Sequence, residues 1–230
     1  MNKLGIAILA LAPSVALAHN SPGTLRLGVS YNHTSLSGAA ANMPGLTLGV
    51  GGQYHWVGIR AGVSYARGDG ASLETFGARA VASPHAAVSP YMSVGLVDLA
   101  SLSGATSTAT TYQVNSGGLI TPITTVTNLP VRGVVMGYGF AGLRARLDLN
   151  NPRWQIAAHA GIGTGIGGST TGLPTAAPGG SPFATSVGAS LRYRVTPHAV
   201  AALTYTRVAI PVRGVTFRSE GVELSMGRIF

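Results

Sequence analysis

Stretches in which apolar and polar residues alternate recur along this chain, and they limit its fold more than any other feature. In the most regular stretch, residues 183–195, Val187, Leu191 and Tyr193 alternate with Ser190 and Arg192. Because successive side chains of a β-strand point to opposite faces, each such stretch has one apolar face and one polar face. The pattern favours an all-β fold in which every strand separates two different environments.

Ten strands are predicted from this alternation. They cover residues 25–31, 46–53, 57–65, 76–80, 88–96, 134–149, 154–162, 183–195, 201–205 and 221–230. In the sixth stretch the apolar phase shifts near Ala141 and Gly142, which predicts a β-bulge there. The count falls to eight if two of the shorter stretches are extensions of a neighbour or belong to loops.

The connections between these strands alternate in length. Long ones follow the first, fifth, seventh and ninth strands, while those after the second, fourth, sixth and eighth are short. The segments 102–130 and 167–182 are rich in Ser, Thr, Gly or Pro and are predicted to be exposed loops. This asymmetry is typical of a closed antiparallel transmembrane β-barrel, which has short periplasmic turns, longer extracellular loops and an even strand count.

The composition agrees with a barrel in lipid. Only 9% of the residues are charged, 46% are hydrophobic and 33 are glycine, whereas about 25% of the residues of an ordinary soluble domain are charged. A membrane barrel needs an apolar outer face and an interior filled by small and polar residues. The chain has no Cys and therefore no disulfide. Basic runs with interleaved aromatic residues are missing, so we expect no nucleic-acid partner.

The amino-terminal residues 1–18 have the pattern of a cleaved secretory signal peptide. Asn2 and Lys3 precede an almost wholly apolar run from Leu4 to Leu17, and a small-residue cleavage pattern ends at Ala18. The run is shorter than the about 20 residues that a membrane-spanning helix needs. We therefore expect an exported protein whose residues 19–230 form one domain. The exported alternatives to an outer-membrane barrel are a soluble periplasmic protein and a secreted soluble β-sandwich.

The last ten residues form the closing strand of the predicted barrel. Val222, Leu224, Met226 and Phe230 share one face of this strand. A closing strand with an aromatic last residue resembles that of bacterial outer-membrane β-barrels, in which the assembly machinery reads this segment. The chain departs from the usual form at Arg228, where that pattern has an aromatic or aliphatic residue.

Over nearly the whole mature length, the pattern resembles the small barrels of the OmpA and OmpX kind. The resemblance implies a location in the cell outer membrane of a Gram-negative bacterium. It also implies contact with outer-membrane lipid and lipopolysaccharide and recognition by the barrel assembly machinery. A monomer is one allowed oligomeric state.

The alternation places nine charged residues on the face that would line the lumen: Arg26, Arg60, Arg79, Arg144, Arg146, Asp148, Arg192, Arg194 and Glu223. Charges inside a narrow barrel must be paired or hydrated. One interpretation is a plug of Arg–acid pairs and water that fills the lumen. The other is a cationic lumen that attracts anions. Eight or ten strands leave too little room for a wide pore, so at most a narrow, anion-preferring pore is expected.

Other motifs indicate no cofactor or metal. The glycine-rich segment 161–168 lacks the helix and the acidic residue that a dinucleotide fingerprint needs. The histidines lack metal-ligand spacing. The remaining candidate is a hydrolytic triad of His33, Ser35 and Glu220 near the outer leaflet, which is similar to the His-x-Ser pair of outer-membrane lipid A deacylases.

We expect no enzymatic activity, and we keep the lipid A deacylase-like hydrolase as the alternative. The expected role is structural or surface-binding through the loops at about 102–130 and 167–182. Loops rich in Ser, Thr and Gly name no ligand.

Overall fold

The computed structural model describes residues 23–36, 38–102, 105–114, 120–129, 133–149, 151, 153–171, 183–212 and 215–230. The predicted signal peptide lies outside this part of the chain. Twelve strands are present in it: β1 (Thr24–Leu36), β2 (Ala39–Tyr54), β3 (Val57–Gly68), β4 (Ala71–Ala82), β5 (Val88–Ala100), β6 (Ala105–Val114), β7 (Ile120–Leu129), β8 (Gly133–Asp148), β9 (Trp154–Thr171), β10 (Ala184–Thr196), β11 (Ala199–Val212) and β12 (Val215–Ile229). No helix among the described residues is long and apolar enough to cross a membrane.

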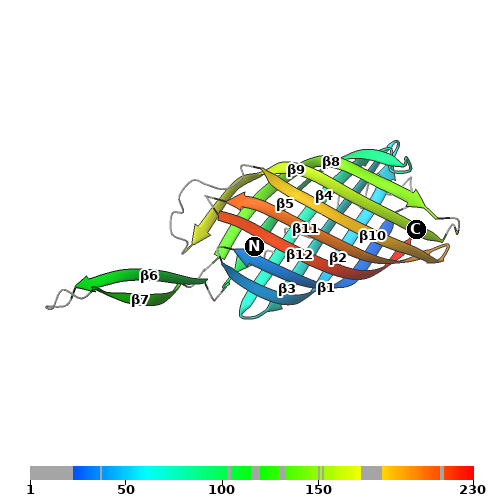
Figure 1. Cartoon of the computed structure of the whole chain (residues 1–230). Helices are drawn as coiled ribbons and strands as arrows, with labels where there is room; N and C mark the ends of the chain where they lie inside the picture. Colours follow the sequence, from blue (N-terminus) through cyan, green and yellow to red (C-terminus); the bar gives the residue numbers. More distant parts are fainter. Residues whose placement is uncertain are drawn as a thin grey trace, which may run out of the picture.

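Ten of these strands form one closed antiparallel barrel (Figure 1). The order around the barrel is β1-β12-β11-β10-β9-β8-β5-β4-β3-β2. Closure is made by β1 and β12, which pair from Thr24 with Ile229 to Leu36 with Phe217. The predicted count of ten strands is therefore confirmed, and the β-sandwich alternative is wrong.

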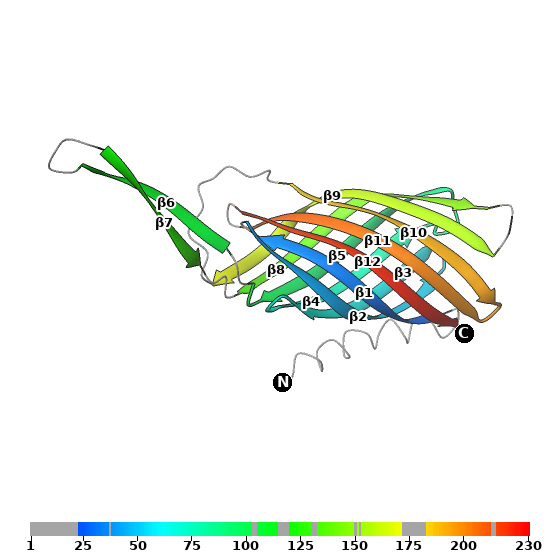
Figure 2. The ribbon, with the colours of Figure 1, turned by 60° about the horizontal axis from the view of Figure 1, so that its bottom comes forward.

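The strands β6 and β7 pair only with each other. They form a hairpin in register from Ala105 with Leu129 to Val114 with Ile120. Figures 1 and 2 show this hairpin projecting beyond one end of the barrel. It lies within the predicted loop 102–130, so that segment carries regular structure outside the barrel wall.

The two ends of the barrel differ. At one end, called here the turn end, lie the connections at 55–56, 83–87, 149–153 and 197–198 together with the first and last described residues. At the other, called the loop end, lies the β6–β7 hairpin. The strands extend farther toward the loop end than the alternation predicts, because β1 ends at Leu36 and β2 already begins at Ala39.

Two predicted long connections are therefore wrong, namely those after the first and ninth predicted strands. The connection after the ninth predicted strand is short, because β11 ends at Val212 and β12 already begins at Val215. The alternation does not predict that β2 begins as early as Ala39, because residues 39–45 are mostly small. Alanine on the inward face gives little contrast with the neighbours on the outward face.

The β-bulge expected at Ala141 and Gly142 is also wrong. Strand β8 pairs without interruption across these residues with both β5 and β9. The register shifts instead at Met136 and Gly137, opposite Gly167, which has φ 67°. Glycine tolerates this conformation without the steric cost that a side chain would add.

The apparent phase shift has another cause: the interior of the loop-end half is apolar. The side chains of β8 alternate between inward and outward without a shift of phase. The inward-facing ones near the loop end are buried and apolar. The inward side chains at this level form one cluster, the apolar plug, which includes Leu36, Ala39, Ala41, Met43, Ala66, Ala71, Leu73, Val97, Leu99, Leu102, Val134, Met136, Phe140, Ala184, Ile210, Val212 and Phe217. The expectation of a polar lumen therefore holds only for the turn-end half.

Candidate functional site

The turn-end half of the barrel interior contains two adjoining cavities. The inner cavity has a volume of about 410 Å³ and reaches up to Leu73, Val97, Phe140 and Phe217 of the apolar plug. The second, called here the vestibule, has a volume of about 420 Å³. Its walls include residues at the first and last positions of strands, such as Thr24, Asp148 and Ile229, so it lies at the turn end.

Three arginines line both cavities and stand between them: Arg26, Arg60 and Arg192. They come from β1, β3 and β10, and the inward phase of each strand brings them together. Arg60 lies close enough to Arg26, Arg79, Arg144 and Arg192 to be repelled by all four. The centre of the turn-end half is therefore a cluster of like charges, called here the arginine cluster and defined by these five residues.

Arg79 is held against two aromatic rings. Its Nη2 lies 3.2 Å from Nε2 of His159, and its guanidinium lies 4.7 Å from the centre of the Tyr91 ring. The Tyr91 and His159 rings meet edge to face at 5.7 Å. A cation over an aromatic face is attracted by the ring quadrupole. Neither Tyr91 nor His159 was among the predicted site residues, although the alternation gives both the inward phase.

Arg144 and Arg146 are fixed at the turn end. The side chain of Arg144 is only 7% exposed, and it donates a hydrogen bond of 3.0 Å to the carbonyl oxygen of Pro84. Arg146 forms an ion pair of 2.9 Å with Asp148, whose carboxylate also accepts a hydrogen bond of 2.9 Å from Gln155. These two arginines have defined partners and serve as part of the wall.

The remaining predicted lumen charges are placed as follows. Arg194 lines the vestibule and is exposed. Glu223 lines the inner cavity and attracts Arg26 electrostatically. Arg153, which the alternation did not select, also lines the vestibule, because the connection before β9 brings it to the rim.

Positive charge exceeds negative charge in this interior. Eight arginines and two acids line the two cavities together. Ion pairs within the described residues include Arg146–Asp148 and Arg207–Glu220, and the second lies on the outer wall at the loop end. The interpretation as a plug of Arg–acid pairs therefore accounts for the rim at Arg146 and for Arg26 near Glu223, but not for the rest of the arginine cluster.

One polar atom of the cluster has no partner. The Nε of Arg192 is buried and makes no hydrogen bond within the described residues. A buried donor without an acceptor costs about 1–3 kcal/mol, and more when the group is charged. The cavity beside it is large enough for water or a ligand to supply the acceptor.

Glycines on the inward faces make room for these large side chains. A Cβ at Gly227 would collide with Cγ of Arg26, and one at Gly188 would meet the His159 ring. A Cβ at Gly51 would lie 3.0 Å from Cγ of Arg60. The high glycine content is thus partly explained by the packing of Arg and aromatic side chains inside a narrow barrel.

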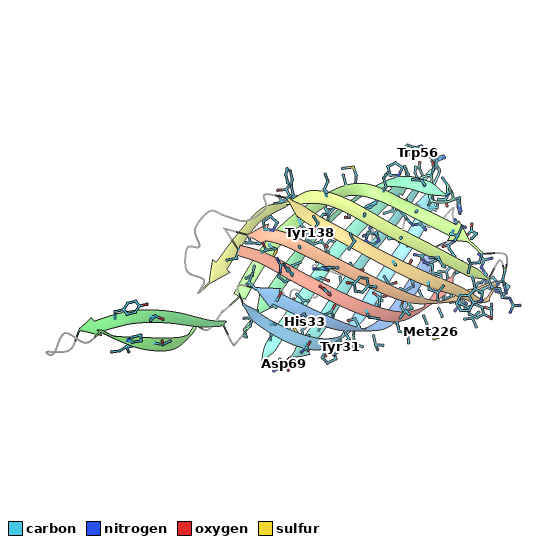
Figure 3. All side chains as sticks on the ribbon, in the orientation of Figure 1. Tyr31, His33, Trp56, Asp69, Tyr138 and Met226 are labelled. Atoms are coloured by element: carbon cyan, nitrogen blue, oxygen red, sulfur yellow. The ribbon has the colours of Figure 1, made fainter. Side chains whose placement is uncertain are left out.

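The outer face is apolar between two groups of aromatic residues. Leu27, Leu46 and Ile162 are 65%, 66% and 66% exposed. Tyr31, Tyr65 and Tyr205 lie toward the loop end of this belt, and Tyr54, Trp56, Trp154, Tyr193 and Phe230 lie at its turn end. Figure 3 shows Tyr31 and Asp69 toward one end of the barrel and Trp56 and Met226 toward the other. In the described strands, the outward-facing charges of this belt lie at its two aromatic levels: Arg228 beside Phe230 at the turn end, and Glu74 and Asp98 level with Tyr65 toward the loop end.

The three residues of the hydrolase alternative lie close together but do not form a relay. His33 of β1 faces Glu220 of β12 in register. However, Nδ1 of His33 lies 2.9 Å from the side-chain oxygen of Asn42, and the Glu220 carboxylate is paired with Arg207 at 3.1 Å. No hydrogen bond joins Ser35 to His33 among the described contacts. Nor do three or more His, Asp or Glu residues gather there into a group that could hold a metal.

The predicted assembly segment lies on the outer wall of β12. Val222, Leu224 and Met226 are exposed, and Phe230 is 66% exposed at the turn end. The guanidinium of Arg228 lies 5.5 Å from the centre of the Phe230 ring, and the Phe230 amide donates a hydrogen bond of 3.0 Å to the Gly23 carbonyl. The last residue is thus tied to the first described one at the barrel seam.

Comparison with known proteins gives structural neighbours only. No family model matches the chain, and no curated protein matches it. The chain is similar to the crystal structure of Neisserial surface protein A, at 12% identity and a TM-score of 0.43, covering 90% of this chain and 97% of that one. It is similar to the translocator domain of the autotransporter NalP from Neisseria meningitidis, at 13% identity and a TM-score of 0.45, covering 99% and 96%. A further similar structure is Ail, the attachment invasion locus protein of Yersinia pestis, at 12% identity and a TM-score of 0.35, covering 91% and 99%.

Proposed function

We propose that this chain is an integral outer-membrane β-barrel protein with a structural or surface-binding role. The observation that carries the proposal is the apolar belt on the outer wall, bounded by two aromatic groups, with its outward-facing charges at the levels of those groups. Each large apolar side chain left in water forgoes about 1.5–3 kcal/mol of burial. A belt of this size around the whole barrel requires lipid, and aromatic girdles mark the two interfaces of membrane barrels.

The direction of insertion follows from the two ends. The longest connections of the barrel, from β5 to β8 and from β9 to β10, lie at the loop end, and both described ends lie at the turn end, which favours a periplasmic position for the turn end. The predicted signal peptide at 1–18 supports export. The loop end then faces the cell exterior, and its hairpin β6–β7 stands outside the membrane.

Lipopolysaccharide is the proposed lipid partner at the loop end. Arg67 and Arg218 are exposed and face outward just beyond the aromatic group at that end. Guanidinium groups at this level suit the phosphates of an outer-leaflet headgroup. The terminal segment with Phe230 is proposed to be read by the barrel assembly machinery.

The interior favours a role other than conduction. The apolar plug fills the loop-end half, and water and ions enter such a region at high cost. A surface-binding role needs the loop end, where the hairpin offers two strand edges that no other described strand pairs with. Such edges can accept an added strand from a partner.

Insertion tests this proposal directly. We expect the folded barrel to migrate differently before and after boiling on a gel and to fractionate with the outer membrane. Leu27→Arg places a charge in the belt. Near the midplane this should make the free energy of insertion less favourable by about 2–4 kcal/mol. Thr110→Arg on the exposed hairpin is the matched control and should leave insertion unchanged.

Two results would contradict the proposal. One is a folded protein that stays soluble without detergent and migrates alike in both gel states. The other is release of an acyl chain from lipid A that disappears in Ser35→Ala, which would favour the hydrolase instead.

A further inference from the structure

The arginine cluster has fewer counter-charges than cations, because only Glu223 near Arg26 and Asp148 near Arg144 oppose five arginines among the described residues. Arg60 is surrounded by four other arginines and pairs with no carboxylate in the described part of the chain. The buried Nε of Arg192 has no hydrogen-bond partner there. Unpaired cations held together away from bulk water are strongly destabilising. A cavity lined by five arginines and one carboxylate therefore attracts an anion.

The members of the cluster divide into held and free groups. Arg79 is engaged by His159 and Tyr91, and Arg144 donates to the Pro84 carbonyl. Arg26, Arg60 and Arg192 line both cavities, and the described contacts include no hydrogen bond from these three guanidinium groups. Their donors are available to a molecule that enters from the vestibule.

We propose that the two cavities form a blind binding site for a multiply charged oxyanion of the phosphate class, which enters at the turn end and contacts Arg26, Arg60 and Arg192. Guanidinium groups present planar pairs of donors that match phosphate oxygens, and several of them converge here. Chloride carries one charge and is a single atom, so it does not match the fork with two separate acceptor atoms as a phosphate does. The volumes of about 410 and 420 Å³ suit a pyrophosphate or a small phosphorylated molecule.

The site is blind because the apolar plug closes its far side. The inner cavity ends against Leu73, Val97, Phe140 and Phe217, which supply no donor to an anion. An anion attracted into the interior is held there and has no path onward. The inference thus replaces an anion-preferring pore with an anion-binding cavity, and it depends on the barrel interior rather than on the proposed surface role.

Titration calorimetry on the folded full-length barrel in detergent micelles tests the site. The probe is pyrophosphate, with chloride at matched ionic strength as the reference anion. We expect saturable binding of one pyrophosphate per barrel and none of chloride. Arg60→Gln and Arg192→Gln should each weaken the affinity by about tenfold or more, because each removes a charge-assisted contact.

Arg207→Gln is the matched control, since it removes an arginine that is paired with Glu220 on the outer wall. It should leave the affinity unchanged. Gel migration before and after boiling shows in parallel whether each variant folds. Arg60→Lys is a second cavity variant, which keeps the charge but loses the planar pair of donors.

The inference is overturned if the wild type gives no saturable binding. It is also overturned if the cavity and outer-wall variants lose affinity equally, because that outcome indicates an adventitious ion only. A barrel that inserts normally but binds no pyrophosphate would refute this site and leave the proposed function standing. Failure of the wild type to insert would refute the proposed function instead.

Discussion

At the scale of single residues, the space beside each inward glycine decides what the wall can hold. A Cβ at Gly142 would collide with the backbone of Ala160 on the neighbouring strand, which cannot move aside. A Cβ at Gly49, also on an inward face, would meet only the Ala61 carbonyl oxygen at 3.7 Å. Sequence alone does not separate these two glycines by available space, because the alternation does not show how closely the neighbouring strand packs against each.

We therefore expect Gly142→Ala to destabilise the barrel by about 1–3 kcal/mol through overpacking, while Gly49→Ala is nearly neutral. Urea-induced unfolding from lipid vesicles, followed by the gel shift between folded and unfolded protein, measures both. Equal stabilities of the two variants would show that the wall adapts at Gly142.

At the scale of the strand, alternation predicted the existence and order of the barrel strands but not their loop-end extents. It works in the turn-end half because a lipid face of Leu and Val opposes an interior of Gly, Ser and Arg. It fails where both faces are apolar or small, as in β8, where Met136 and Phe140 face inward and Leu143 faces outward. The alternation predicts that the arginines of the cluster face inward. It does not predict how few acidic residues lie near them, because that depends on how ten strands come together.

The closing strand β12 carries a prediction of its own. Deletion of Phe230 should reduce insertion into the outer membrane, because it removes the aromatic end of the segment that the assembly machinery is proposed to read. Trp56→Ala is the matched control, since Trp56 is a similarly exposed aromatic residue at the same end of the barrel. Comparable amounts of inserted protein in the deletion variant and the control would argue against a terminal signal.

At the scale of the whole molecule, the barrel is closed by its own core. The plug residues are buried as in a soluble protein, and Phe217 is 1% exposed. The turn-end half, by contrast, contains the two cavities and the arginine cluster. The loop-end half is therefore closed by the apolar plug, whereas the turn-end half contains open cavities.

Planar-bilayer recordings should give no conductance for the wild type. The double variant Leu73→Ser and Phe217→Ser removes two large side chains that separate the inner cavity from the loop end. It should admit water and produce a narrow, anion-preferring conductance. Adding Arg192→Ser should reduce the preference for anions, because it removes one positive charge from the path through the two cavities. Conductance in the wild type would contradict the seal.

The hairpin β6–β7 has ten paired positions from Ala105–Leu129 to Val114–Ile120. At about 3.4 Å per residue it stands about 30 Å tall, which is close to the thickness of the hydrocarbon layer that the barrel crosses. In the proposed orientation the protein rises above the cell surface about as far as it is sunk into the membrane. Among the described residues, its threonine-rich ladder is then what an antibody, a phage or a neighbouring cell meets first.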